Sequence, residues 1–419
     1  MKKALGLALA LLLVLGMCIG AGASAEGALS GTITLASNED AVDIWNQIAA
    51  RFQAKYPDAK LEVTPFVDYT ALNQNVMAAH QAGDDFDLIT VNHVDTLTFI
   101  KGGLLLPLND LLKANGTDID SIIMGKLEDM GKLGDVAYTV PIDTDTRIML
   151  VNTDLFAKYN LAVPATMDEM LSAGKAISEA DKGDYVFTDE MCTNGDYFST
   201  YEAGIFLQSC GGQLYAVDEN GKATATIDTP EMRRYLTFIS ELIKYMPEDC
   251  TTNNDARSAF REGNIGMYTF GPWEYIAMDL SQLSFGYTLT KVPAGSAGSV
   301  STSGGFQLGI GSGTKNPELA FAFLNFLIND PECMSLIGST GLPTIESAYK
   351  AGMFADDKYK VFMEQLASSN LPQKPVANLG EVVAAFTGYW NEMCVGNLTV
   401  DQVVAQAQPA VQALLDENN

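Results

Sequence analysis

The sequence predicts an α/β protein with two lobes, each a mostly parallel sheet flanked by helices and joined to the other by hinge crossings. The chain has 419 residues, whereas a single hydrophobic core stops growing at roughly 250–300 residues. Apolar residues make up 47% and charged residues 18%, which suffices for a sizeable core. Short apolar runs also alternate with amphipathic helices along the chain, which is the pattern of sheets covered by helices.

The first hundred residues predict one such layer. Residues 32–36 and 61–66 are apolar runs of strand length. Residues 41–54 lie between them and predict a helix, because their apolar side chains fall on one face. Residues 87–91 form a short apolar run that is typical of a buried strand. Strands and helices that alternate in this way favour a largely parallel sheet.

Later helices are marked by their starting signals. Thr166 and Glu169 have the spacing of a capping box. Pro230 follows a Thr at the first position of another helix. A last helix is expected to begin after Thr399, and Pro409 should kink or divide it, because proline removes a backbone donor.

Three polar or Gly-rich segments predict crossings between the two lobes. They are residues 141–146, 296–305 and 338–343. Several crossings form a hinge, and a cleft between lobes is a common place for a ligand. We therefore expect lobe 1 to comprise residues 26–142 and 304–342, and lobe 2 residues 143–303 and 343–419.

The N-terminus has the order of a secretory signal peptide. Lys2 and Lys3 precede an uncharged apolar stretch, residues 4–16. Ala23-Ser24-Ala25 then offers a cleavage site between small residues. We expect residues 1–25 to be removed and the protein to be exported to the periplasm or the outer face of the cytoplasmic membrane.

Cys18 leaves an alternative route of processing open. Residues 15–18 resemble a lipoprotein box, in which the Cys is lipidated and becomes the N-terminal residue. Met17 departs from the small residue that such boxes carry before the Cys. The cleavage site at Ala25 favours free secretion over a lipid anchor at Cys18.

Charge excludes several classes of partner. The formal net charge is -27, which argues against nucleic acid as a partner and against binding of anionic lipid through a polybasic segment. His80 and His93 are the two histidines, too few for a His-rich zinc site. We expect no metal and no cofactor.

The cysteines are scattered along the chain. Five lie beyond the signal peptide, at positions 192, 210, 250, 333 and 394, with no C-x-x-C spacing. A large core does not need disulfide staples, so buried free thiols are favoured. A bridge between Cys192 and Cys210 remains an alternative.

Searches for enzyme signatures find none of the nucleotide-binding or nucleophile motifs. The chain has no G-x-x-x-x-G-K-[ST], no G-x-G-x-x-G and no G-x-S-x-G. Acidic residues are numerous, so a glycosidase-type carboxylate pair stays open at this level.

Three segments have the character of ligand contacts. Trp273 and Glu274 follow a Gly-Pro turn, which presents a ring outward, although a Trp packed beneath a loop is the alternative. Asp143 and Asp145 lie at a crossing and could equally form a solvated turn. Arg147 could contact the ligand or pair with either aspartate.

The third segment follows the first strand, where ligands of parallel α/β layers bind. Glu39 and Asp40 lie there, and a helix cap is the alternative for this segment. Together the three segments suit a sugar, because its apolar faces stack on rings and its hydroxyls bond to carboxylates and guanidinium groups.

Several short motifs, weak singly but specific in order and spacing, carry a resemblance over nearly the whole mature chain. They occupy residues 45–57, 86–89, 102–108, 138–156, 164–169, 263–273, 316–320 and 341–343, and include Tyr138-Thr139-Val140-Pro141, Gly271-Pro272-Trp273 and Asn316-Pro317-Glu318. The chain thereby resembles bacterial extracellular solute-binding proteins of ABC transporters, in the group that binds maltose and multiple sugars.

That resemblance implies the two-lobed periplasmic-binding-protein fold of type II and a function. A family member captures a carbohydrate by hinge closure and delivers it to membrane permease subunits; it is a monomer and not an enzyme. Trp273 matches the family's sugar-stacking Trp, and Asp145 matches an acidic cleft residue. Further predicted ligand-binding positions are Glu39, Asp40, Asn92, His93, Asp143, Arg147, Tyr201, Glu274, Gly304 and Gly305.

Two departures concern the aromatic platforms. The loop after residue 91 carries Asn92 and His93 where maltose-binding members have a Trp. A second family Trp aligns near Val383, and Trp390 is displaced from it. The kind of sugar therefore stays open. A polyamine or other polar solute is an alternative ligand, and a secreted carbohydrate-active enzyme is a further alternative.

Overall fold

The computed structural model describes residues 29–124, 127–189, 204–218, 221–252, 255–350, 354, 356–369, 376 and 378–417. The predicted signal peptide, Cys18, Cys192 and Tyr201 lie outside these residues. Within them, no helix combines the length and the apolar character that crossing a bilayer requires.

The first sheet contains the strands predicted near the N-terminus. Its order is β2-β1-β3-β15-β6, and its strands are β1 (Gly31–Asn38), β2 (Ala59–Phe66), β3 (Leu88–Asn92), β6 (Thr139–Pro141) and β15 (Phe306–Ile310). The helices of this body are α2 (Val42–Lys55), α3 (Tyr69–Ala82), α4 (Thr96–Lys101), α5 (Asn109–Asn115), α6 (Ile119–Ile122), α13 (Pro317–Asn329) and α14 (Pro331–Ile337), with the short hairpin β4 (Lys132–Leu133) and β5 (Val136–Ala137).

The second sheet has the order β13-β8-β12-β9. Its strands are β8 (Ile148–Asn152), β9 (Tyr185–Thr188), β12 (Ile265–Phe270) and β13 (Tyr287–Thr290). The helices of this body are α7 (Thr153–Lys158), α8 (Met167–Ala180), α10 (Pro230–Leu242), α11 (Ala256–Arg261), α12 (Glu274–Ala277), α15 (Lys360–Leu366), α16 (Leu379–Cys394) and α17 (Val400–Asp416), with the hairpin β10 (Tyr215–Val217) and β11 (Ala223–Ala225).

Each sheet is covered on both faces, because successive side chains of a strand point to opposite sides. In β8, Met149 and Val151 join the core that also contains α8, α10, α16 and α17. Ile148 and Leu150 pack on the other side with Phe260 of α11. The first sheet is covered in the same way by two separate apolar clusters.

The expectation of mostly parallel sheets was wrong, because both sheets are mixed. β1 runs parallel to β2 and β3, but β15 runs antiparallel to β3 and β6. In the second sheet only β12 and β9 are parallel. The cause is the route of the chain: β15 enters its sheet straight from a crossing, so Phe306 pairs with Asn92, the last residue of β3.

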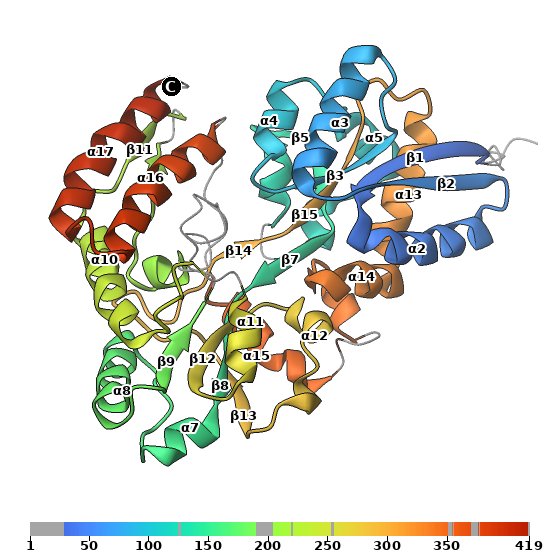
Figure 1. The fold of residues 1–419 in the computed structure, drawn as a ribbon. Helices are drawn as coiled ribbons and strands as arrows, with labels where there is room; N and C mark the ends of the chain where they lie inside the picture. The colour runs from blue at the N-terminus through green and yellow to red at the C-terminus, as the bar shows by residue number, and fades with distance from the viewer. Residues whose placement is uncertain are drawn as a thin grey trace, which may run out of the picture.

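The three segments expected to cross between the bodies meet in one small sheet. β7 (Asp143–Thr146) pairs with β14 (Ser303–Gly304) and with β16 (Leu342–Pro343), both antiparallel. Figure 1 shows β7 and β14 running between the body that carries β1 and the body that carries β8. Hydrogen bonds therefore tie the crossings to one another.

The chain does not leave the first body at the third crossing. Ile345 and Ala348 pack in the core of the first sheet, and the Met124 amide donates to the Thr344 carbonyl over 2.9 Å. Residues 344–348 therefore pack with lobe 1, whereas the sequence-based division assigns them to lobe 2; Tyr349 already packs against the cluster of Ile148 and Leu150.

Local signals predicted helix ends well. The capping box of Thr166 and Glu169 is present, and Thr399 forms a second one with Gln402. The expected division at Pro409 does not occur, because α17 runs without a break from Val400 to Asp416. Buried residues on both sides of the proline, such as Ala407 and Val411, hold the two halves on one core.

The cysteines that the structure describes are buried free thiols: Cys210, Cys250, Cys333 and Cys394.

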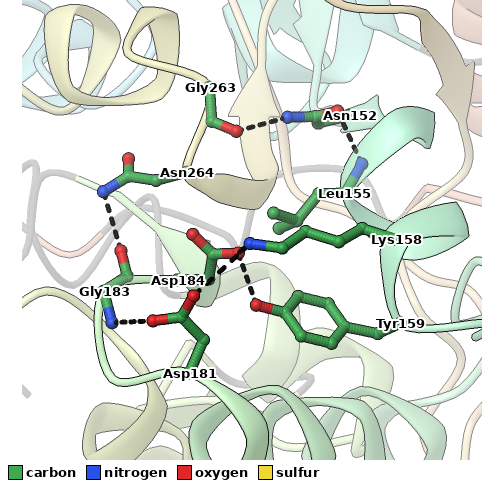
Figure 2. A network of polar contacts seen from close by, with 9 residues as sticks. All are labelled: Asn152, Leu155, Lys158, Tyr159, Asp181, Gly183, Asp184, Gly263 and Asn264. Atoms are coloured by element: carbon green, nitrogen blue, oxygen red, sulfur yellow. Dashed lines mark hydrogen bonds and ion pairs between the residues drawn. The ribbon is translucent and has the colours of Figure 1, made fainter.

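A network of polar contacts lies beyond the end of β8, around the start of α7 (Figure 2). Lys158 Nζ lies 2.6 Å from Asp184 Oδ2, and the Tyr159 hydroxyl donates to the same oxygen over 2.6 Å. Hydrogen bonding to Asp184 raises the pKa of Lys158. The side-chain amide of Asn152, the cap residue of α7, donates to the Gly263 carbonyl over 2.9 Å. This bond connects the start of α7 to the turn before β12.

Candidate functional site

A cavity of about 730 Å³ lies between the two sheets, beside the crossing strand β7. Its volume falls within the range of about 300–1,000 Å³ that is usual for small-molecule sites. Most predicted ligand-binding residues line it: Asp40, Asn92, His93, Asp143, Asp145, Arg147, Trp273, Glu274 and Gly305. The sequence therefore located this cleft through residues from both bodies and from the crossing.

Two predicted residues do not line the cavity. Glu39 is exposed in the short 3-10 helix that follows β1. Gly304 is buried in β14, where it pairs with Asp145. The alternative of a helix cap for the segment after β1 is not supported, because the side chain of the cap residue Asn38 makes no capping hydrogen bond. Tyr201 lies outside the described residues.

Trp273 follows β12 on its Gly-Pro turn and reaches the cavity as a half-buried ring. The guanidinium carbon of Arg147 lies 4.7 Å from the centre of the indole. Arg147 is also 2.5 Å, Nη1 to Oδ1, from Asp145. The pairing of Arg147 with an aspartate is confirmed, and its contact with a ligand stays a prediction, since the side chain also lines the cavity.

Glu274 lines the cavity, and its carboxylate already has partners within the protein. Its side chain is buried, and both carboxylate oxygens accept hydrogen bonds of 2.7 Å from Arg257. The Tyr268 hydroxyl donates to one of these oxygens over 3.3 Å. The carboxylate is thus occupied by the protein itself, and its neighbour Trp273 is anchored beside a charged pair.

Asp143 organises the start of β15. Its Oδ1 accepts the Phe306 amide over 2.5 Å. Gly305, between β14 and β15, has a φ of +130°, a region that favours glycine. A Cβ there would also meet the Asp143 carbonyl oxygen. A glycine is therefore needed for the backbone to turn into the sheet beside the cavity.

His93 is a neutral group of the cleft near neutral pH. Burial lowers its pKa to about 4, and the nearby positive charge of Arg147 acts in the same direction. The backbone of Gly305 opposes this shift by hydrogen bonding. The neighbouring Asn92 side chain accepts the Val94 amide over 3.2 Å.

The sequence missed an aromatic pair in the cavity wall. Tyr69, at the start of α3, and Phe306, at the start of β15, stack with ring centroids 4.9 Å apart and planes 26° apart. Both are half-buried and line the cavity. Burial first, and then Asp143, raise the pKa of Tyr69 to about 12. Neither residue lies in a recognisable motif, because their pairing depends on the fold.

Other lining residues also escaped the sequence analysis, notably Asp189 and Arg257. Trp390 is fully buried in α16, and neither it nor Val383 lines the cavity. Among the described residues, no group of three or more His, Cys, Asp or Glu side chains is placed to hold a metal ion.

Comparison with known proteins identifies the family. Residues 36–332 match the family described as bacterial extracellular solute-binding protein. A probable ABC transporter-binding protein of Deinococcus radiodurans is 28% identical over 255 residues, which span 56% of this chain and 59% of that protein. The melibiose/raffinose/stachyose-binding protein of Bacillus subtilis is 24% identical, over 84% of this chain and 83% of its own.

Solved structures of sugar-binding proteins share the fold. The sugar-binding protein MalE of Xanthomonas citri superposes with a TM-score of 0.79 at 17% identity, over 92% of this chain and 98% of that one. The GacH receptor of Streptomyces glaucescens, also solved with acarbose, has a TM-score of 0.77 at 22% identity, over 93% and 100%. The fold is the two-lobed periplasmic-binding-protein fold. The chain belongs to the family of bacterial extracellular solute-binding proteins, which act outside the cytoplasm and are binding proteins, not enzymes.

Proposed function

We propose that this solute-binding protein is the substrate-binding component of an ABC importer and that its cargo is an oligosaccharide. The observation that carries the proposal is the half-buried Trp273 ring on the wall of a 730 Å³ cleft lined by carboxylates and guanidinium groups. An indole face matches the apolar face of a pyranose, and the charged side chains match its hydroxyls. The Bacillus subtilis relative is named for binding melibiose, raffinose and stachyose, and the Streptomyces glaucescens receptor was solved with acarbose. Both support an oligosaccharide as the class of cargo.

The binding step is closure of two lobes about the β7 crossing. We take lobe 1 as residues 26–142 and 304–342, extended to Ala348 because Ile345 and Ala348 pack there. Lobe 2 comprises residues 143–303 and the remainder. Asp143, Asp145 and Arg147 lie on or beside the hinge strand, so closure brings the walls of the cleft together around them. Expelling water then strengthens each hydrogen bond to the sugar.

The protein acts outside the cytoplasmic membrane as a monomer and delivers its cargo to permease subunits. The signal peptide at residues 1–25 supports export. Free secretion is favoured by the cleavage site at Ala25, and Cys18 supplies the alternative of a lipid anchor. Mass analysis of the N-terminus separates the two, since only a lipidated protein begins at Cys18.

Thermal unfolding against a ligand panel tests the proposed cargo. The panel contains raffinose, maltotriose, galactose, glucose and spermidine. A ligand at a hundred times its dissociation constant adds about 2.7 kcal/mol to the free energy of unfolding, which raises the midpoint visibly. We expect a trisaccharide to do so. A response to spermidine alone would replace the sugar by a polyamine, a cation that the excess of carboxylates in the cavity lining would attract.

A further inference from the structure

The Tyr69–Phe306 pair lies on the opposite body from Trp273. Tyr69 begins α3 of the first body and Phe306 begins β15 of the first sheet, whereas Trp273 follows β12 of the second sheet. All three rings line one cavity. β7 lies between the two walls and contributes Asp143 and Asp145 to the same cavity. The cleft therefore has an aromatic surface on each side of its acidic floor.

The first-body pair is held rigidly. The Asp68 side chain accepts the Ala71 amide over 2.7 Å and so fixes the start of α3. The Phe306 amide donates to Asp143, and its carbonyl accepts the Ile142 amide over 3.0 Å. The two rings then lie nearly parallel. Rings that are already oriented lose little entropy when a ligand stacks on them.

Packing alone accounts poorly for where these rings lie. Burial first, and then the negative charges of Asp143, Asp40 and Asp145, raise the pKa of the Tyr69 hydroxyl. Phe306 packs only at the margin of the first core, and Tyr69 belongs to none of the apolar clusters. Half-buried rings beside carboxylates, in a cavity, have the character of a contact surface for a ligand with both apolar and hydroxyl faces.

We propose that Tyr69, supported by Phe306, is a second sugar-stacking platform, so that the cleft takes a carbohydrate of at least two rings, one on Trp273 and one on Tyr69. This inference rests on the proposed function. Tyr69 thereby gives lobe 1 an aromatic surface, while the loop after β3 contributes Asn92 and His93 to the same cavity. Specificity for chain length then resides in Tyr69, whereas Trp273 serves every sugar that binds.

Calorimetry on Tyr69→Ala tests this division of roles. One probe is the trisaccharide, raffinose or maltotriose, that binds the wild type more tightly. The other is the matching monosaccharide of the panel, galactose or glucose, whose affinity is measured by displacement. We expect Tyr69→Ala to weaken the trisaccharide about 5- to 150-fold, the range for loss of one stacking ring, and to change the monosaccharide by less than about twofold. Tyr69→Phe should retain trisaccharide affinity, because it keeps the ring.

Two further variants keep the test decisive. Tyr69→Leu retains apolar contact with Phe306 and should lose trisaccharide affinity while the apo protein keeps its unfolding midpoint. Tyr287→Ala, which removes an exposed ring of β13 outside the cavity, is the matched control and should change nothing. Unchanged trisaccharide affinity in Tyr69→Ala, or equal losses for both sugars, would overturn the second platform. A wild type that binds no sugar at all would instead overturn the proposed function.

Discussion

The guanidinium carbon of Arg147 lies 4.7 Å from the centre of the Trp273 ring, while Nη1 of the same side chain lies 2.5 Å from Asp145. Arg147 thereby links the acidic hinge strand β7 to the indole that follows β12 of the second body. It also covers one face of the ring, since a cation and a ring attract through the ring's negative face. The orientation of the proposed stacking surface is thus fixed from the hinge.

Trp273→Ala should weaken sugar binding by about 1–3 kcal/mol, by analogy with the loss of other stacking platforms. The reason is that the ring supplies the flat apolar surface of the second lobe. Isothermal titration with the sugar found in the panel measures the loss, and Tyr287→Ala serves as the control on the same body. Affinity equal to that of the wild type would show that Trp273 only packs against Arg147.

Arg257→Ala should lower the free energy of unfolding by about 3 kcal/mol, because it leaves the buried Glu274 carboxylate without its guanidinium partner. The Arg257 side chain is 32% exposed, so the loss should stay at the lower end for buried pairs. Denaturant unfolding measures it.

A surface arginine provides the matched control for this change. Arg233 pairs with the exposed Asp228 and Asp401, and Arg233→Ala should cost no more than about 1 kcal/mol. Equal costs for the two variants would contradict a structural role for the Arg257–Glu274 pair.

His93 should make stability depend on pH in the acidic range. Its pKa in the fold is about 4, below the ordinary value of about 6.5. Between these values the unfolded chain binds a proton that the folded protein does not, so the free energy of unfolding falls as the pH falls. This contribution is about 3 kcal/mol and is fully lost near pH 4.

The comparison of wild type with His93→Gln isolates that contribution, because carboxylates titrate in both proteins alike. Denaturant unfolding at several values of pH from 4 to 7 should give a smaller decline for the variant. Parallel curves for the two proteins would mean that the His93 imidazole does not resist protonation in the cleft.

Anionic sugars should bind more weakly than neutral ones. The described cavity lining carries five carboxylates, namely Asp40, Asp143, Asp145, Asp189 and Glu274, but only the two guanidinium groups of Arg147 and Arg257. A net repulsion of about 1.4 kcal/mol already gives a tenfold loss of affinity. Titration with a galacturonic acid oligomer and a neutral galactoside measures the difference, which added salt should narrow. Equal affinities would contradict an acidic cleft.

The sequence predicted features that depend on neighbours along the chain. The strands of the first layer, the capping box at Thr166 and the outward turn at Trp273 are such features, because period and cap chemistry are local. Strand direction was mispredicted, since the position of β15 beside β3 depends on where the hinge delivers the chain.

Contacts between distant segments explain what the sequence analysis missed in the site. Tyr69 begins a helix and Phe306 begins a strand far along the chain, so the two rings meet only in the folded protein. Glu274 was expected to touch a ligand. Its pairing with Arg257 could not be predicted, because nothing in the segment around Glu274 indicates that partner. Residue type and position on a turn located the cleft, whereas the role of each side chain required its partners.

Small-angle X-ray scattering with and without the sugar from the panel tests most directly whether the two lobes close on a carbohydrate about β7. We expect a smaller radius of gyration at saturating sugar, and no change for Trp273→Ala at a sugar concentration that leaves most of its sites empty. Identical dimensions of the free and the saturated wild type, with binding verified by titration in the same buffer, would contradict closure.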